Sequence, residues 1–297
     1  MHTIFAIEPD AINNWHDLRY AVEKFGYSKG LLIARYPGKW ERMVVEACKL
    51  NGVSDLDLTR VVERLRAIKG DRLVRMGLPY GDGGWLENVG VEDVLNKLSA
   101  VLVRNQVISD KFHRIGDAYE NLFENHRDFR VKRNANALAE AAKYVLTASD
   151  QIVLVDPYFQ SRRKCTKVLD SMLRVCQEND FLIKQVIVFT DYNTDPRDLT
   201  VVSQQYETLL GVWGERNVRI TVCRVAGNQL NHDFHARYLF NQKAGLRFDR
   251  GFVEPEAHNE REHETDVICM DTELVNRLYA RFIEARATIN VVDEVLL

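Results

Sequence analysis

The sequence predicts an α/β fold, with a mixed-sheet α/β sandwich preceded by a smaller α/β domain. Three observations predict it. Short apolar runs of strand length alternate with amphipathic stretches of helix length along most of the 297 residues. One run, residues 151–156, is apolar almost throughout, which is typical of a parallel strand buried on both faces. Two further short strands flank a turn at 241–244 and predict an antiparallel hairpin, so the sheet is mixed.

Residues 1–110 are expected to form the smaller α/β domain. Its strands are predicted at 3–7 and 30–35 and its helices at about 13–25, 40–50, 55–68 and 91–98. Asp10 or Asn13 is the expected N-cap of the first helix, and Ser54 or Asp55 that of the third. Residues 77–90 are rich in glycine and predict a loop with one exposed aromatic side chain. The loop has neither Walker nor GxGxxG spacing, so it predicts no nucleotide-binding motif.

Basic and aromatic residues cluster around the second strand of this domain. Such a mixture can form a nucleic-acid-binding surface, because bases stack on aromatic rings and phosphates pair with cations. Glu23, Glu41 and Glu46 lie among the same residues, so an ordinary solvated helix edge of mixed charge is the preferred interpretation. The residues concerned are Lys29, Arg35, Lys39, Arg42, Tyr27, Tyr36 and Trp40.

Residues 111–133 are polar and charged, and we expect a charged linker or a connecting helix there. Residues 134–297 then predict the main domain, which begins with an alanine-rich helix at 134–146 and Asn134 as its N-cap. Strands are predicted at 151–156, 184–190, 218–225 and 266–269, helices at 164–178, 199–210 and 272–286, and the hairpin before the last strand.

The hairpin carries the most suggestive chemistry. Residues 234–240 alternate as in a half-buried strand, so that His235, Arg237 and Leu239 share one face. The opposite face holds Phe234, Ala236, Tyr238 and Phe240. A titratable imidazole beside a permanent cation suits a site that handles a phosphate group. The alternative is that both are polar residues on the solvent side of an ordinary hairpin.

Composition excludes several classes of protein. An apolar fraction of 46% is ordinary for a globular core, and a net charge of −3 means that any basic binding surface is local. The five cysteines form no CxxC pair, which predicts neither a zinc ribbon nor a disulfide framework and indicates a reducing compartment. No leader and no apolar run of about 18 residues is recognised, so we expect a cytoplasmic protein without membrane contact.

The order of these elements and motifs resembles one half of a phospholipase D superfamily protein, over about residues 134–297. His235-Ala236-Arg237 occupies the HxK signature of that family. Gly251 falls at the glycine of the family's Gly-Ser pair, and Glu264 at the carboxylate that orients the catalytic histidine.

The sequence also departs from the family pattern. Arg237 replaces the lysine, Gln242 the aspartate and Phe252 the serine, and Glu254 lies near the expected asparagine, where a carboxylate would repel phosphate. The chain has one signature where a complete family site uses two, so the resemblance implies a homodimer.

The resemblance implies a phosphodiesterase that works without metal or cofactor. His235 would attack phosphorus to form a phosphohistidine, while the partner subunit's His235 protonates the leaving oxygen. Arg237 and Gly251 would bind the phosphate, and Glu264 would orient the imidazole. Nucleic acid is the expected substrate, which suggests a nuclease of prokaryotic mobile-element or antiviral defence. Arg162, Arg163 and Lys164 are candidate nucleic-acid contacts, or else an ordinary solvated helix start.

Two alternatives remain open. The stronger is a catalytically degenerate module that keeps the fold for dimerisation and for binding phosphate, nucleic acid or protein, with residues 1–110 as a surface for partner proteins. The weaker is a metal site, in which His232 and His235 form HxxH and His258, Glu262, His263 and Glu264 follow; on a strand, however, HxxH places its two histidines on opposite faces. Asp156 ends a strand at the sheet edge where sites form in α/β folds, and equally can cap the following turn.

Overall fold

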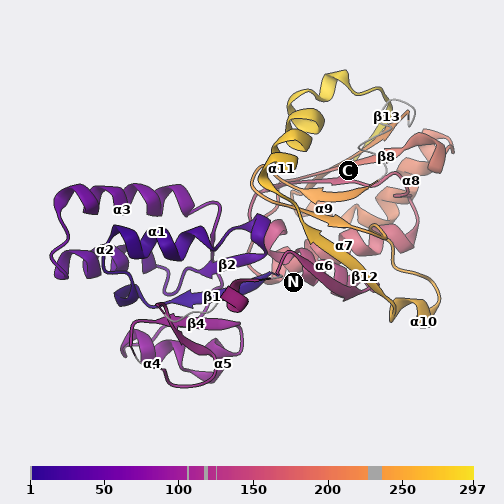
Figure 1. The fold of residues 1–297 in the computed structure, drawn as a ribbon. Helices are drawn as coiled ribbons and strands as arrows, with labels where there is room; N and C mark the ends of the chain where they lie inside the picture. The colour runs from indigo at the N-terminus through magenta and orange to yellow at the C-terminus, as the bar shows by residue number, and fades with distance from the viewer. Residues whose placement is uncertain (1, 106, 117–119, 125, 227–235) are drawn as a thin grey trace. The chain divides into compact units, whose positions relative to one another are not determined.

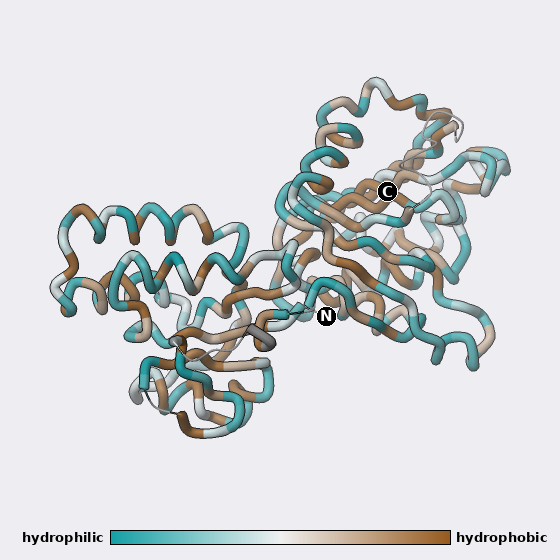
Figure 2. The backbone as a smooth tube through the Cα atoms, viewed as in Figure 1, coloured by the Kyte–Doolittle hydropathy of each residue, from teal (hydrophilic) through white to brown (hydrophobic). Residues whose placement is uncertain are grey.

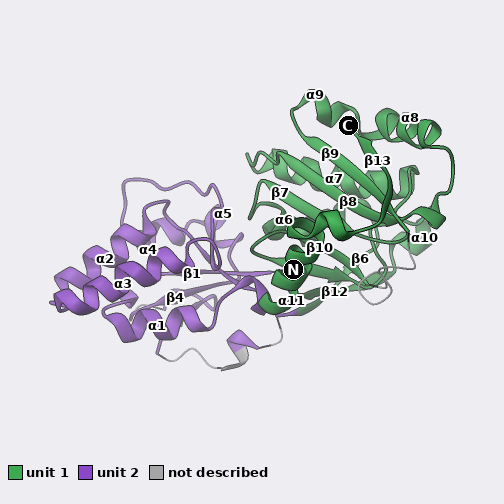
Figure 3. Cartoon of the chain, turned by 90° about the horizontal axis from the view of Figure 1, so that it is seen from above, with its two compact units in different colours: residues 1, 128–297 green, residues 2–127 purple. Residues whose placement is uncertain are grey.

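A computed structural model describes residues 2–105, 107–116, 120–124, 126–226 and 236–297. The chain forms two compact units, residues 2–127 and 128–297 (Figure 3). Each unit contains one sheet with helices, so the expected α/β fold class is confirmed (Figure 1). Hydrophobic residues follow the strands, whereas the helices alternate between hydrophobic and hydrophilic residues (Figure 2).

The first unit is built on a five-stranded parallel sheet in the order β3-β2-β1-β4-β5. Its strands are β1 (Thr3–Ile7), β2 (Leu31–Ala34), β3 (Leu73–Val74), β4 (Ala100–Val103) and β5 (Phe112–Arg114). The last three, which are two to four residues long, were not predicted.

The helices of the first unit largely match the predicted ranges. They are α1 (Trp15–Glu23), α2 (Trp40–Leu50), α3 (Asp55–Ile68), α4 (Trp85–Val89) and α5 (Glu92–Leu95), with 3₁₀ turns η1 (Pro9–Ala11) and η2 (Tyr27–Lys29). Ser54 caps α3 as expected. The cap of α1 is Asn14 and not Asp10 or Asn13, because its side chain accepts from the backbone N–H groups of His16 and Asp17.

The aromatic residues of the predicted basic and aromatic cluster, Tyr27, Tyr36 and Trp40, are buried. Trp40 is fully buried and its Nε1 donates to the carbonyl of Ile7 at 2.7 Å. Trp85, in the glycine-rich segment, is also buried, and its Nε1 donates to the carbonyl of Tyr36 at 2.9 Å. Tyr80, the other aromatic of that segment, is half-buried and packs on the ring of Tyr36. The expected exposed aromatic loop is therefore wrong, because a short helix turns the indole inward, where its N–H finds a carbonyl.

The second unit is built on an eight-stranded mixed sheet in the order β13-β9-β8-β7-β10-β11-β12-β6. The parallel strands are β7 (Gln151–Val155), β8 (Gln185–Asp191) and β9 (Arg219–Val225). The antiparallel strands are β6 (Asp128–Lys132), β10 (Arg237–Phe240), β11 (Gly245–Phe248), β12 (Glu264–Cys269) and β13 (Val291–Leu296).

The helices of the second unit cover both faces of its sheet. They are α6 (Ala135–Leu146), α7 (Arg163–Glu178), α8 (Leu199–Leu210), α9 (Val212–Glu215), α10 (His258–Arg261) and α11 (Thr272–Tyr279), which continues as a π-helical turn (Ala280–Glu284). Tyr238 and Phe240 of β10 pack in one core cluster with α11 and this turn. Leu239 points to the other face and is also fully buried, where α6 contacts β10 and β11. The hairpin strand is therefore buried on both faces and is not the half-buried strand that its alternation predicts.

The segment 111–133 differs from the expected linker or connecting helix. It contains β5, a 3₁₀ turn (Glu120–Phe123) and β6. β6 forms the sheet edge beside β12, where Arg130 pairs with Asp266 at 2.9 Å and Lys132 with Glu262 at 2.6 Å. The charges that suggested a linker are the exposed alternate positions of an edge strand.

Across the residues for which the structure gives a placement, no helix is long and apolar enough to cross a bilayer.

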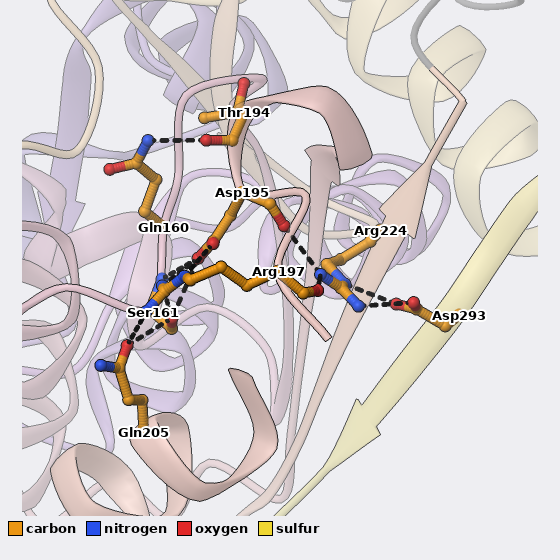
Figure 4. Close-up of polar contacts among 8 residues, drawn as sticks. All are labelled: Gln160, Ser161, Thr194, Asp195, Arg197, Gln205, Arg224 and Asp293. Atoms are coloured by element: carbon orange, nitrogen blue, oxygen red, sulfur yellow. Dashed lines mark hydrogen bonds and ion pairs between the residues drawn. The ribbon is translucent and has the colours of Figure 1, made fainter. Parts of the chain in front are cut away.

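Arg224 fastens the edge strand β13 to β9. It is 1% exposed, and its Nε and Nη2 each lie 2.5 Å from the carboxylate of Asp293 on β13. Its Nη1 donates to the carbonyls of Asp195 and Arg197, at 2.8 and 2.9 Å, in the loop that follows β8 (Figure 4). One buried guanidinium thus holds three segments that are far apart in sequence.

We expect Arg224→Met to lower the free energy of unfolding by about 3–5 kcal/mol, because it leaves a carboxylate and two carbonyls without their donor. Arg219→Met, at the exposed start of the same strand, is the matched control and should change it by less than about 0.5 kcal/mol. Urea unfolding followed by circular dichroism measures both. Equal effects of the two substitutions would contradict the role given to Arg224.

Candidate phosphate-binding site

Asp156 and Arg237 lie together at the end of the second sheet where its parallel strands finish. Asp156 directly follows β7, and Arg237 opens the antiparallel strand β10, in which Tyr238 lies opposite Val155. This register places Asp156 and Arg237 as neighbours on the same face. The carboxyl ends of parallel strands are where ligand sites form in α/β sheets. Arg237, a predicted site residue, therefore lies at a position of the sheet that is suited to binding a ligand.

The guanidinium of Arg237 is held on two sides. Its carbon lies 5.0 Å from the centre of the Tyr158 ring, and its Nη1 donates to the carbonyl of Asp249 at 2.8 Å at the surface. Its Nε is buried and has no hydrogen-bond partner among the described residues. Tyr158 is 54% exposed. Arg237 is therefore fixed in place, and its terminal Nη2, which has no hydrogen bond to a described residue, can donate to an anion.

Asp156 is a buried carboxylate that joins the loops around Arg237. It is fully buried, and its two oxygens accept from the backbone N–H groups of Tyr158 at 2.9 Å and Phe252 at 3.0 Å. Burial raises the pKa of Asp156, and these two N–H groups and the charge of Arg237 oppose that rise. The bond to Tyr158 shows that Asp156 does cap the turn after β7.

Gly251 lies against both of these residues. Its φ is +71°, and a Cβ there would lie 2.5 Å from Asp156 Oδ2 and 3.1 Å from Arg237 Cγ. Glycine is required both by the backbone conformation and by the close approach of the two side chains. Two of the residues predicted to bind phosphate, Arg237 and Gly251, are therefore adjacent.

Glu264 is not brought together with Arg237. Arg237 lies opposite Phe248, and Phe248 lies opposite Val267, so these three side chains share one face of the sheet. Glu264 is three residues from Val267 and therefore belongs to the other face. There it is exposed, lies opposite Lys132 and lines a separate surface pocket of about 450 Å³.

The predicted nucleophile His235 lies outside the described residues, as does His232, so the roles given to them remain predictions. Within the described part of the chain, no group of three or more histidine, cysteine or carboxylate side chains could hold a metal ion.

Phe252 and Glu254 are both structural. Phe252 is fully buried. Glu254 is 5% exposed and accepts from the N–H of Ala135 at 2.8 Å, at the start of α6, and from Lys167 Nζ at 2.5 Å. Burial raises the pKa of Glu254, but these two donors outweigh it, so that the pKa is lower than usual. This carboxylate is neutralised by its own partners, which removes the expected repulsion of a phosphate.

Three basic residues, Arg162, Arg163 and Lys164, lie at the start of α7. Arg162 is the N-cap residue and, like Arg163, is exposed, while Lys164 is half-buried. None of the three forms an ion pair with another described residue. They are connected to Asp156 and Tyr158 by a loop of a few residues.

A polar network that the sequence analysis missed makes this loop rigid. The buried hydroxyl of Ser161 lies 2.9 Å from Asp195 Oδ2 and accepts from Arg197 Nη2 at 2.7 Å (Figure 4). Arg197 also donates to both oxygens of Asp195 at 2.6 Å and to Gln205 Oε1 at 2.9 Å. The only signal in the sequence is the polar run after the strand at 184–190. The network fixes the loop that carries Tyr158.

We expect Gly251→Ala to destabilise the protein more than Gly52→Ala does. Gly52 has the same backbone conformation, φ +70°, but an added Cβ would meet nothing within 4 Å. Backbone strain of about 1–3 kcal/mol is therefore common to both variants, and Gly251→Ala adds an overpacking cost of about 1–3 kcal/mol. Differential scanning calorimetry measures the melting temperature of each variant, and Gly251→Ala should lower it more than Gly52→Ala does. Equal losses would show that Asp156 and Arg237 can move aside.

We also expect Asp156 to make the protein less stable as the pH rises above about 4, the ordinary pKa of an aspartate. Because its pKa is raised on folding, the folded chain keeps a proton that the unfolded chain has lost in this range. The unfolding free energy of the wild type minus that of Asp156→Asn should therefore fall between pH 4 and pH 7. Urea unfolding of both proteins at each pH measures this difference, and a constant or rising difference would contradict it.

Comparison with known proteins identifies no family for this chain. No protein-family profile matches the sequence, and no curated protein matches it. Among solved structures, the phospholipase D family member Nuc from Salmonella typhimurium is similar over 55% of this chain and 96% of its own, with 6% identity and a TM-score of 0.34. TrmBL2, an archaeal chromatin protein with a novel mode of DNA binding, is similar over 94% of both chains, with 14% identity and a TM-score of 0.29. Similarity this low supports no argument about function, which must come from the residues of the site.

Proposed function

We propose that the second unit binds the phosphodiester backbone of nucleic acid at Arg237. The observation that carries the proposal is the guanidinium itself, fixed between Tyr158 and the Asp249 carbonyl beside Gly251, with its terminal Nη2 left without a hydrogen bond to a described residue. An arginine fixed in this way loses little conformational freedom when it donates to a phosphate.

Neighbouring residues favour a polymer over an isolated phosphate. Tyr158 is 54% exposed, and its ring can stack on a base next to the bound phosphate. Arg162 and Arg163 are exposed a few residues further along and can contact successive phosphates. The chain as a whole has a net charge of −3, so this binding would depend on the local cations.

Hydrolysis of the bound phosphodiester by a homodimer is the second candidate. It is favoured by the adjacency of Arg237 and Gly251, whose order matches the phospholipase D signature. In the first step the imidazole of His235 forms a bond to phosphorus, the bond to the leaving oxygen breaks, and the partner subunit's His235 protonates that oxygen. In the second step the same partner residue takes a proton from water, which displaces the imidazole. Binding is the first proposal because Glu264 lies on the other face from Arg237 and Phe252 is buried, so neither contributes a polar side chain beside Arg237.

We expect Arg237→Ala to weaken binding of labelled single-stranded DNA or RNA about tenfold, the effect of losing one charged hydrogen bond. Arg247→Ala is the matched control, since Arg247 is an exposed arginine on the neighbouring strand β11 and lies opposite Tyr238, on the other face. Fluorescence anisotropy at two salt concentrations measures both, and the difference should shrink at high salt. Equal affinities for the two variants would overturn the proposal.

The same oligonucleotides, incubated with a chelator, separate binding from hydrolysis. Turnover that His235→Ala abolishes without loss of binding would establish the second candidate. Binding that depends on Arg237, with no turnover by the wild type, would establish the binding module alone.

A further inference from the structure

We propose that the first unit binds a nucleoside phosphate in a cationic pocket between α2 and α3. The pocket has a volume of about 380 Å³, which is in the range of small-molecule sites, roughly 300–1,000 Å³. It is formed within the first unit and depends on none of the residues around Arg237.

The side chains around this pocket are mainly cationic. Lys39 and Arg42 come from the start of α2, Arg66 and Lys69 from the end of α3, and Arg35 from the end of β2. The one carboxylate in the lining is Glu41. Five positive charges therefore face one negative charge, which favours an anion.

Most of these cations are not neutralised by the protein. Among the described residues, Lys39, Arg66 and Lys69 form no ion pair. Arg42 pairs only with Glu46 in an exposed contact, with exposed fractions of 78% and 53% for the two side chains. Such contacts contribute little and are readily exchanged for a ligand.

Arg35 gives the pocket a fixed element. Its Nε donates to Glu41 Oε2 at 2.6 Å, and both side chains are only 17% exposed. Because Glu41 engages Nε, the terminal nitrogens of the guanidinium remain available to a phosphate. Arg35 directly follows β2, at the carboxyl end of a parallel sheet, where ligands of such sheets bind.

The apolar part of the pocket indicates what else the ligand carries. Val45 of α2 and Val62 and Leu65 of α3 form its apolar lining. Inorganic phosphate would gain nothing from these side chains, whereas a planar base buries its faces on them. Together, an apolar lining and surrounding cations fit a nucleoside phosphate, with its base on the valines and its phosphates toward the basic side chains.

The test is isothermal titration calorimetry of the full chain with ADP, GDP, pyrophosphate and adenosine, each titrated separately. A nucleoside diphosphate should bind more tightly than pyrophosphate or adenosine, because only it uses both parts of the pocket. Lys69→Glu should weaken binding of the diphosphate about tenfold. Lys49→Glu is the matched control, since Lys49 is an exposed lysine at the end of α2 that does not line the pocket, and it should leave binding unchanged.

Two further variants test the base and the location. Val62→Thr places a hydroxyl in the apolar lining and should weaken ADP or GDP without affecting pyrophosphate. The nucleotide binding that depends on Lys69 should persist in Arg237→Ala, in which phosphate binding at Arg237 itself is removed. No binding of either nucleotide at millimolar concentration would overturn the proposal. Equal affinity for pyrophosphate and nucleotides, or equal effects of Lys69→Glu and Lys49→Glu, would overturn it as well.

Discussion

The candidate site depends on the buried carboxylate of Asp156. It binds the N–H of Tyr158 in its own loop and the N–H of Phe252, nearly a hundred residues later, and it lies beside the cation of Arg237. Because a buried carboxylate is stable only when its oxygens are satisfied, these segments must meet at one point. Gly251 is a consequence of the same contact, since any larger residue would collide with Asp156.

This arrangement explains how Arg237 can be both fixed and available. Asp156 interacts with the guanidinium through its charge, while its own oxygens are occupied by backbone N–H groups. Arg237 therefore does not spend its hydrogen bonds on a salt bridge with Asp156. A single hydrogen bond to the Asp249 carbonyl and the contact with the Tyr158 ring orient the guanidinium. The network around Ser161 and Asp195 then keeps the loop of Tyr158 in place.

The two units present cations in different ways. In the second unit, one guanidinium is oriented by a carbonyl and an aromatic ring, which suits a phosphate that is part of a chain. In the first unit, several long side chains surround an apolar lining, which suits a compact ligand with its own apolar part. Phe252 and Glu254 both serve the fold, because Phe252 is buried and Glu254 accepts from the N–H group at the start of α6.

The sequence by itself determined the α/β class, most helices, the parallel strands of the second unit and the division of faces within β10, because these follow from local periodicity. It could not determine which residues of other strands share the face of Arg237. Which residues share this face depends on how β10 pairs with β11 and how β11 pairs with β12. This pairing places Val267 on the face of Arg237 and Glu264 on the opposite face. The edge strands β6 and β13 and the burial of Trp85 were likewise decided by tertiary structure, because pairing and packing partners far along the chain set them.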